Sequence, residues 1–171
     1  PFYINGKFLQ STSPKTDLGA IFNFIHHFDI LDNLLEISPH KIFAIPNLID
    51  KKIKKEINVD IFLQYSKNIN SFLSLGWITF GKYSTIELFF KNKQIICDLQ
   101  NQEIQILYNE KPSKKIKQKF QEPLLLELED FSKCVKNNQN PLSNGTIGAR
   151  IVKIAETATR SMNESKPILL R

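Results

Sequence analysis

The alternation of apolar and polar residues along the chain predicts a series of short β-strands. Segments rich in Ile, Phe and Tyr place apolar side chains at every second position, which is the pattern of a strand with one buried face. The segments are residues 2–10, 41–45, 59–66, 70–79, 83–91, 94–99 and 103–108. Polar turns as short as Asn92-Lys93 and Gln100-Asn101 join the later ones. Strands linked this tightly must be antiparallel, because a parallel pair needs a long crossover.

Three other segments show helical spacing of apolar residues. In residues 19–35 the apolar side chains fall within a stripe of about 120°. The stripe contains Ile21, Phe24, Ile25, Phe28, Leu31 and Leu35. Pro123 opens a second helix. Its stripe contains Leu124, Leu125, Leu128, Phe131 and Val135. A third helix follows Asn144-Gly145. Strands bracketed by helices predict one α+β domain over residues 1–171, with a mostly antiparallel open-faced sheet and helices packed on one face.

Three polar side chains lie off the apolar stripe of the first helix. Asn23, His26 and Asp29 follow one another at intervals of three, so they are neighbours on the helix surface. A histidine flanked by an amide and a carboxylate can be held in one tautomer and tuned for proton transfer. The same spacing is also typical of solvated side chains on a surface helix.

Residues 19–29 consist of Gly19, an apolar run, Asn23, and then His26 and Asp29 in the form His-x-x-Asp. This order resembles the first helix of the C-terminal domain of the Gfo/Idh/MocA oxidoreductases, in which an aspartate stands at the place of Asn23. Weaker resemblances extend over nearly the whole chain. They are Pro1-Phe2-Tyr3, Ile42-Phe43-Ala44, Val59-Asp60-Ile61, residues 70–77, Glu122-Pro123, residues 126–131, residues 155–161 and Lys166-Pro167-Ile168.

The resemblance implies the substrate-binding and oligomerisation half of an NAD(P)-dependent oxidoreductase acting on a sugar, a nucleotide sugar or a polyol. NAD or NADP would be bound by an N-terminal Rossmann domain that residues 1–171 do not include. These residues contain no G-x-G-x-x-G turn after a strand and only six glycines, so no cofactor-binding residues are expected among them. The chain alone should therefore be inactive, and no metal ligands are expected in it.

The resemblance also assigns roles to the polar residues of the first helix. His26 and Asn23 are expected to be catalytic, with His26 accepting the proton of the substrate hydroxyl or donating a hydrogen bond to the reacting oxygen. His27 and Asp29 are expected to bind substrate. In a D-x-x-x-H register Asn23 would instead pair with His27, so the sequence leaves open which histidine faces the cleft. An amide cannot accept a proton as a carboxylate can. The alternative is a non-catalytic interaction or dimerisation module that has lost the chemistry.

A partner surface is implied as well. In the proteins that this chain resembles, the open sheet face packs against a second subunit, so a homodimer or tetramer through the sheet is expected. Alternation in strands such as 61–66 and 72–77 permits this, because it leaves one side of the sheet partly polar with scattered aromatic residues.

Composition and charge add few constraints. At 171 residues and 42% hydrophobic residues, the chain can bury roughly 70% of its unfolded surface without a disulfide or metal. Cys97 and Cys134 are expected to be reduced, as in a cytoplasmic protein. The net charge of +6 comes largely from lysine runs at 51–55 and 114–119, which are expected to be solvated loops. They lack interleaved aromatics, so nucleic-acid binding is not expected. No apolar run suits a membrane span or signal peptide.

Overall fold

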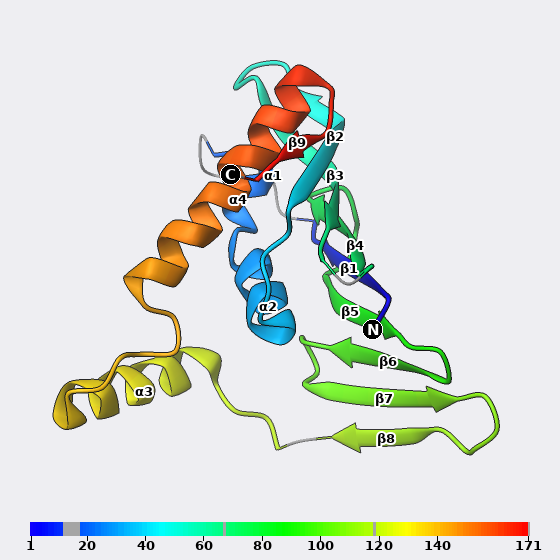
Figure 1. Cartoon of the computed structure of the whole chain (residues 1–171), viewed down its shortest axis with the longest axis vertical. Coiled ribbons are helices and arrows are strands. Elements are labelled where there is room, and N and C mark those ends of the chain that lie inside the picture. The colour runs from blue at the N-terminus through cyan, green and yellow to red at the C-terminus, as the bar shows by residue number, and fades with distance from the viewer. Residues whose placement is uncertain (12–17, 67, 118, 171) are drawn as a thin grey trace.

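The computed structural model describes residues 1–11, 18–66, 68–117 and 119–170. Within them one mixed sheet of nine strands runs through the molecule in the order β8-β7-β6-β5-β1-β4-β3-β2-β9 (Figure 1). The strands are β1 (Tyr3–Leu9), β2 (Lys41–Asp50), β3 (Lys55–Gln64), β4 (Asn70–Gly76), β5 (Tyr83–Phe89), β6 (Lys93–Asp98), β7 (Glu103–Tyr108), β8 (Lys114–Lys117) and β9 (Ile168–Leu169). Every neighbouring pair is antiparallel except β1 and β4.

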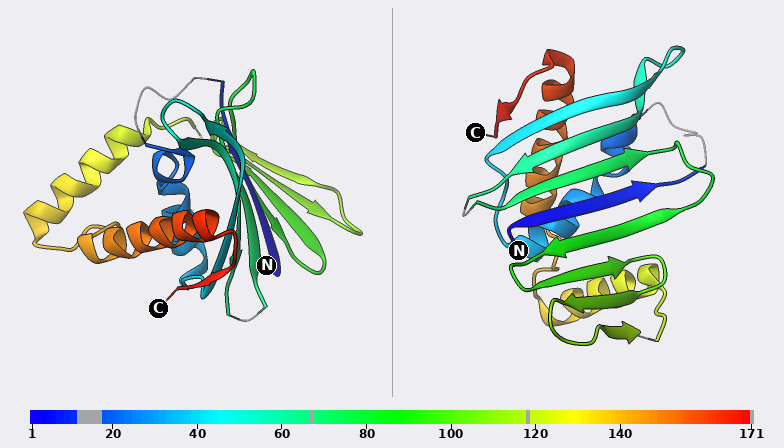
Figure 2. Two further views of the ribbon diagram at one scale, coloured as in Figure 1. Left: turned by 90° about the horizontal axis from the view of Figure 1, so that it is seen from above. Right: turned by 90° about the vertical axis from the view of Figure 1, so that its right-hand side faces the viewer.

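Four helices lie on one side of this sheet and leave the other side open (Figure 2). They are α1 (Ala20–Asn23), α2 (His26–Leu35), α3 (Pro123–Asn137) and α4 (Gly145–Glu164). The predicted α+β class, with a mostly antiparallel open-faced sheet and helices on one face, is confirmed. None of the helices in the described part of the chain is long and apolar enough to cross a membrane.

The core lies between the sheet and helices α1, α2 and α4. Alternate residues of the central strands point toward the helices and are almost fully buried, among them Ile4, Phe8, Ile61, Leu73 and Leu75. Small residues at Ala155 and Ala158 in α4 are also fully buried, and α4 packs against β2, where the hydroxyl of Ser161 accepts a hydrogen bond from the Ala44 amide at 3.1 Å. The alternation predicted from the sequence therefore selects the face that the helices cover.

The opposite face carries a continuous row of paired side chains across the strands. Phe43 of β2 pairs with Phe62 of β3, Phe62 pairs with Phe72 of β4, and Phe72 pairs with Asn5 of β1. Phe62 is 39% exposed. We call this side of the sheet, which no described helix covers, the open face.

The first helical segment is divided into two helices. A single helix was expected over residues 19–35, but α1 ends at Asn23 and α2 begins at His26. The amides of His27 and Phe28 donate to carbonyls three residues back, at 3.0 Å each, which winds this turn more tightly than an α-helix. At about 120° per residue in place of about 100°, the turn rotates His27 toward the apolar stripe.

Three further sequence expectations need correction. The lysine run after residue 113 forms an edge strand, β8, where a solvated loop was expected, because Lys115 and Lys117 both pair with Glu103 of β7. Strand β2 continues past Pro46 with register shifts, since its outer edge is unpaired beyond Ile42 in the described residues and needs no amide donor there. The apolar stripe of α3 is exposed.

Candidate functional site

A cavity of about 270 Å³ lies between α2 and the beginning of α4. Its polar lining is His26 and Asp29 from α2, with Ser143 and Asn144 from the loop before α4. Its apolar lining is Ile25, Ile147, Ile151 and Val152, with Gly148 beside them. A histidine and a carboxylate on a largely apolar floor are suited to a small polyhydroxylated ligand, which has both hydroxyl groups and C–H surfaces.

His26 is the first residue of α2 and its ring is partly solvent-exposed. The ring lies 4.0 Å from that of His27 and stacks on Phe24 at 6.4 Å between centroids. Partial burial lowers the pKa of His26 below the usual 6.5, because desolvation penalises the imidazolium. His26 is therefore neutral at pH 7 and able to accept a proton.

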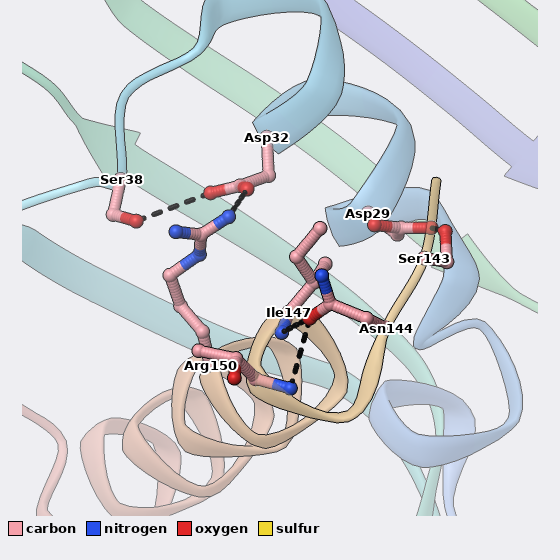
Figure 3. Close-up of polar contacts among 8 residues, drawn as sticks. Asp29, Asp32, Ser38, Ser143, Asn144, Ile147 and Arg150 are labelled. Atoms are coloured by element: carbon pink, nitrogen blue, oxygen red, sulfur yellow. Dashed lines mark hydrogen bonds and ion pairs between the residues drawn. The ribbon is translucent and has the colours of Figure 1, made fainter. Parts of the chain in front are cut away.

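Asp29 joins α2 to the loop that precedes α4. Its carboxylate accepts a hydrogen bond from the Ser143 hydroxyl at 3.0 Å (Figure 3). The adjacent Asn144 caps α4, because its side-chain oxygen accepts from the amides of Thr146 and Ile147 at 3.0 and 3.2 Å. The hydrogen bond between Asp29 and Ser143 therefore joins α2 to the loop before α4 at one wall of the cavity.

A second hollow, of about 290 Å³, continues from the first along α2 and shares Asp29 and Ile147 with it. At its centre the Asp32 carboxylate is 5% exposed and accepts hydrogen bonds from Arg150 and from the Ser38 hydroxyl, the latter at 3.1 Å (Figure 3). Glu36 also lines the hollow. The ion pair between Asp32 and Arg150 ties α2 to α4 beside the cavity.

Asn23 and His27 have different surroundings from His26 and Asp29. The Asn23 amide donates to the carbonyls of Leu18 and Gly19 at 2.8 and 3.0 Å. His27 is 5% exposed, with its ring 3.5 Å from that of Phe8 between centroids. The structure therefore brings His26 and Asp29 together in one cavity and places His27 in the core. Burial, reinforced by the nearby His26, lowers the pKa of His27 to about 3.

The N-terminus of α4 does not offer free amides to a dinucleotide phosphate. The amides of Thr146 and Ile147 at the N-terminus of the longest helix are already used by Asn144, so they are not available to a phosphate. The described residues also hold no group of three or more side chains placed to bind a metal ion.

Sequence reasoning did not identify Asp32, Ser38, Ser143 or Arg150 as part of the site. Asp32 could have been found, because it lies three residues after Asp29 on the same helix. Arg150 and Ser143 could not, since they are 118 and 114 residues away from their partners and no local pattern marks them.

The fold is that of one half of the Gfo/Idh/MocA-type oxidoreductases. It matches UDP-N-acetylglucosamine 3-dehydrogenase GnnA from Acidithiobacillus ferrooxidans with a TM-score of 0.86 over 96% of this chain, at 16% sequence identity. It matches the aldose-aldose oxidoreductase from Caulobacter crescentus, solved with glycerol, with a TM-score of 0.84 over 98% of this chain, at 12% identity. For levoglucosan dehydrogenase, solved with NADH and levoglucosan, the values are 0.83, 98% and 13%.

This chain spans about half the length of these solved structures, namely 54%, 55% and 58% of the three chains. No family model and no curated protein matches the sequence. The resemblance to the C-terminal domain of this oxidoreductase family, predicted from residues 19–29 and the weaker motifs, is confirmed at the level of the fold.

Proposed function

We propose that this chain is the substrate-binding half of an NAD(P)-dependent oxidoreductase that acts on a sugar, a nucleotide sugar or a polyol. The observation that carries the proposal is the shared cavity of His26 and Asp29 in a domain with this fold. The three structural neighbours described above are named for sugar-related substrates, which supports the same substrate class.

The reaction we propose is the oxidation of a secondary alcohol to a carbonyl. The C–H bond breaks with transfer of a hydride, and the O–H bond breaks with loss of a proton. A nicotinamide cofactor held by the other half of the enzyme would accept the hydride. His26 takes the hydroxyl proton, and Asp29 hydrogen-bonds to a second hydroxyl of the substrate or orients it in the cavity. Asn23 and His27 stay in the proposal as the alternative pair of the D-x-x-x-H register.

The protonation state of His26 supports its role as the base. Its pKa lies below 6.5, so the neutral imidazole predominates at pH 7. We expect kcat/KM for alcohol oxidation to be level near pH 7 and to fall as the pH drops through the pKa of His26, because the protonated ring can no longer accept a proton.

The experiment that tests the proposal compares single variants in the protein that carries its dinucleotide-binding half. His26→Ala should lower kcat by roughly 10²- to 10⁴-fold, the range expected on losing a general base. Asn23→Asp should preserve or raise activity if the amide replaces an aspartate. Asn163→Ala is the control, because Asn163 is an exposed residue of α4 that lines neither hollow.

The ranking of the two histidines decides the register. A larger loss of activity from His27→Ala, in a variant that still folds, would move the base to His27 and pair it with Asn23. Negligible effects from all of these changes would favour the second candidate function, a non-catalytic interaction module. The hydrogen bonds of the Asn23 amide to two backbone carbonyls favour that candidate, because they give this side chain a structural role.

We also propose that the open sheet face is a homodimer or tetramer interface. The row of Phe43, Phe62 and Phe72 crosses this face, and the carboxylate oxygen Oδ1 of Asp60 and the amide oxygen of Asn70 are buried there without a partner among the described residues. Apolar side chains and unsatisfied acceptors are both typical of a surface that a second subunit completes. The free thiols of Cys97 and Cys134 support a reducing compartment such as the cytoplasm.

A further inference from the structure

Helix α3 projects from the body of the molecule with its apolar face uncovered (Figures 1 and 2). The face consists of Leu124, Leu125, Leu128, Phe131 and Val135, whose exposed fractions run from 54% to 66%. Of the 15 residues of α3, Cys134 is the buried one. A helix that packs on nothing is expected to be polar all round, so an amphipathic α3 requires a partner.

The ends of α3 are well specified by the sequence even though its face is bare. The Glu122 carboxylate accepts from the Leu125 amide at 2.6 Å, Pro123 occupies the first turn, and Asn138 ends the helix in a left-handed conformation. At its root, the Gln102 side chain bonds the Gln121 backbone twice, at 2.8 and 3.0 Å. The projecting position is therefore held by specific contacts.

A hollow of about 390 Å³ separates the root of α3 from the strands β6 and β7. Its apolar lining comes from Cys97, Leu99, Ile104 and Leu126. Together, the apolar face of α3 and this hollow form a surface that we call the α3 docking surface. It is concave at one end and has room for side chains of a partner.

The matches to solved structures include residues of α3. The matches to solved structures cover 96% to 99% of this chain, so they leave out too few of its 171 residues to omit the 15 residues of α3. Those chains are nearly twice as long as this one, because it spans 54% to 58% of them. In such proteins a further domain of comparable size is available to cover α3.

We propose that the α3 docking surface seats the dinucleotide-binding half of the enzyme, an inference that rests on the function proposed above. After the C-terminal end of α3, residues 138–142 lead to Ser143 and Asn144, which line the cavity with His26. A domain seated on α3 is therefore held beside that cavity, where the hydride acceptor is needed. The open sheet face lies on the other side of the sheet and is left for a second copy of the chain (Figure 2).

The test uses the two-domain protein with a protease site in the linker between its halves. After cleavage, size-exclusion chromatography should show the wild-type halves eluting together. The double variant Leu128→Glu/Phe131→Glu should elute as separate halves, because the two charges lie at the centre of the apolar face. Lys133→Glu is the matched control, since it changes the net charge by the same amount on the opposite side of α3 and should leave the halves together.

Five outcomes separate this inference from the function on which it rests. Wild-type halves that part after cleavage, or a double variant whose halves stay together, would overturn the docking surface while the uncleaved protein still reduces NAD(P). The chain without the dinucleotide-binding half could also be a dimer that the double variant converts to a monomer. In that case a second copy of the chain occupies the α3 docking surface, and the inference is overturned. Loss of co-elution in the double variant alone supports it. Absence of NAD(P)-dependent turnover in the uncleaved wild type would count against the proposed function only.

Discussion

Replacing the buried histidine His27 with phenylalanine tests how the two adjacent histidines differ. His27 is 5% exposed and its ring is tilted against that of Phe8, with 3.5 Å between the ring centroids, so a phenylalanine ring can fill the same space. The pKa of His27 is about 3 in the folded chain, because burial and the neighbouring His26 both disfavour its charged form. In the unfolded chain its pKa should be about 6.5.

The sign of the effect follows from proton binding. Between pH 6.5 and pH 3 the unfolded chain binds a proton at His27 that the folded chain does not, so the free energy of unfolding falls as the pH is lowered through this range. At about 1.4 kcal/mol for each pH unit, the loss attributable to His27 is ~2 kcal/mol at pH 5 and ~4 kcal/mol at pH 3. Above pH 6.5 the His27 ring is neutral in both the folded and the unfolded chain, so His27 no longer lowers the free energy of unfolding.

Urea unfolding at pH 7 and pH 5 measures the difference. The wild-type chain should lose ~2 kcal/mol more than His27→Phe between these two pH values, which corresponds to a melting temperature lower by about 4–8 °C. His40→Gln, which removes an exposed histidine, is the control. Its free energy of unfolding should fall between pH 7 and pH 5 by as much as that of the wild type. An equal pH dependence in His27→Phe and the wild type would refute the reasoning, because His27 would then titrate alike in the folded and unfolded chains.

Three further predictions concern the assembly and the supports of the site. Phe62→Asp on the open face should convert a dimer to a monomer in sedimentation experiments without changing the circular dichroism, whereas Gln139→Asp on an exposed turn should leave the dimer intact. Arg150→Met should lower the free energy of unfolding by about 1–3 kcal/mol because it leaves Asp32 buried without its cation, while Arg160→Met breaks a surface pair with Glu164 at 4.0 Å and should cost less than about 0.5 kcal/mol. Gly19→Ala should lower the free energy of unfolding, measured in urea, by about 1–2 kcal/mol, because the new methyl group would displace the Glu56 carboxylate that accepts a hydrogen bond from the Ile21 amide at 3.0 Å. Gly148→Ala has open space around it and should be neutral or stabilising.

The sheet could be predicted from the sequence wherever one face of a strand is buried. Strand β7 was predicted as residues 103–108, the bounds that the structure shows, because its apolar residues alternate. Strand β8 was missed, since Lys114–Lys117 contains a single apolar residue and is held by ion pairs to Glu103 at 2.5 and 3.0 Å. Such an edge strand depends on its neighbour and leaves little pattern of its own.

The site was predictable only as far as it lies on one helix. The three-residue interval between His26 and Asp29 placed both on one side of α2, and they do line one cavity. The same reasoning did not show that the turn before α2 would separate His26 from His27, because the tighter winding is a property of the packed backbone. Nor did it provide Ser143 or Arg150, which approach α2 through the packing of α4.

The division between the two histidines also bears on how a proton would be handled. Their rings lie 4.0 Å apart, so a charge on His26 further lowers the pKa of His27. His27 is packed against Phe8 and Phe24, and the desolvation of its ring outweighs the hydrogen bond between Nδ1 and the Phe24 carbonyl oxygen, so its charged form is disfavoured. If His26 takes a proton from a substrate hydroxyl, as proposed above, the proton should stay on His26, which is partly exposed and can release it to water. In this arrangement the buried histidine acts as an aromatic support for its neighbour, and its low pKa keeps the two rings from sharing the proton.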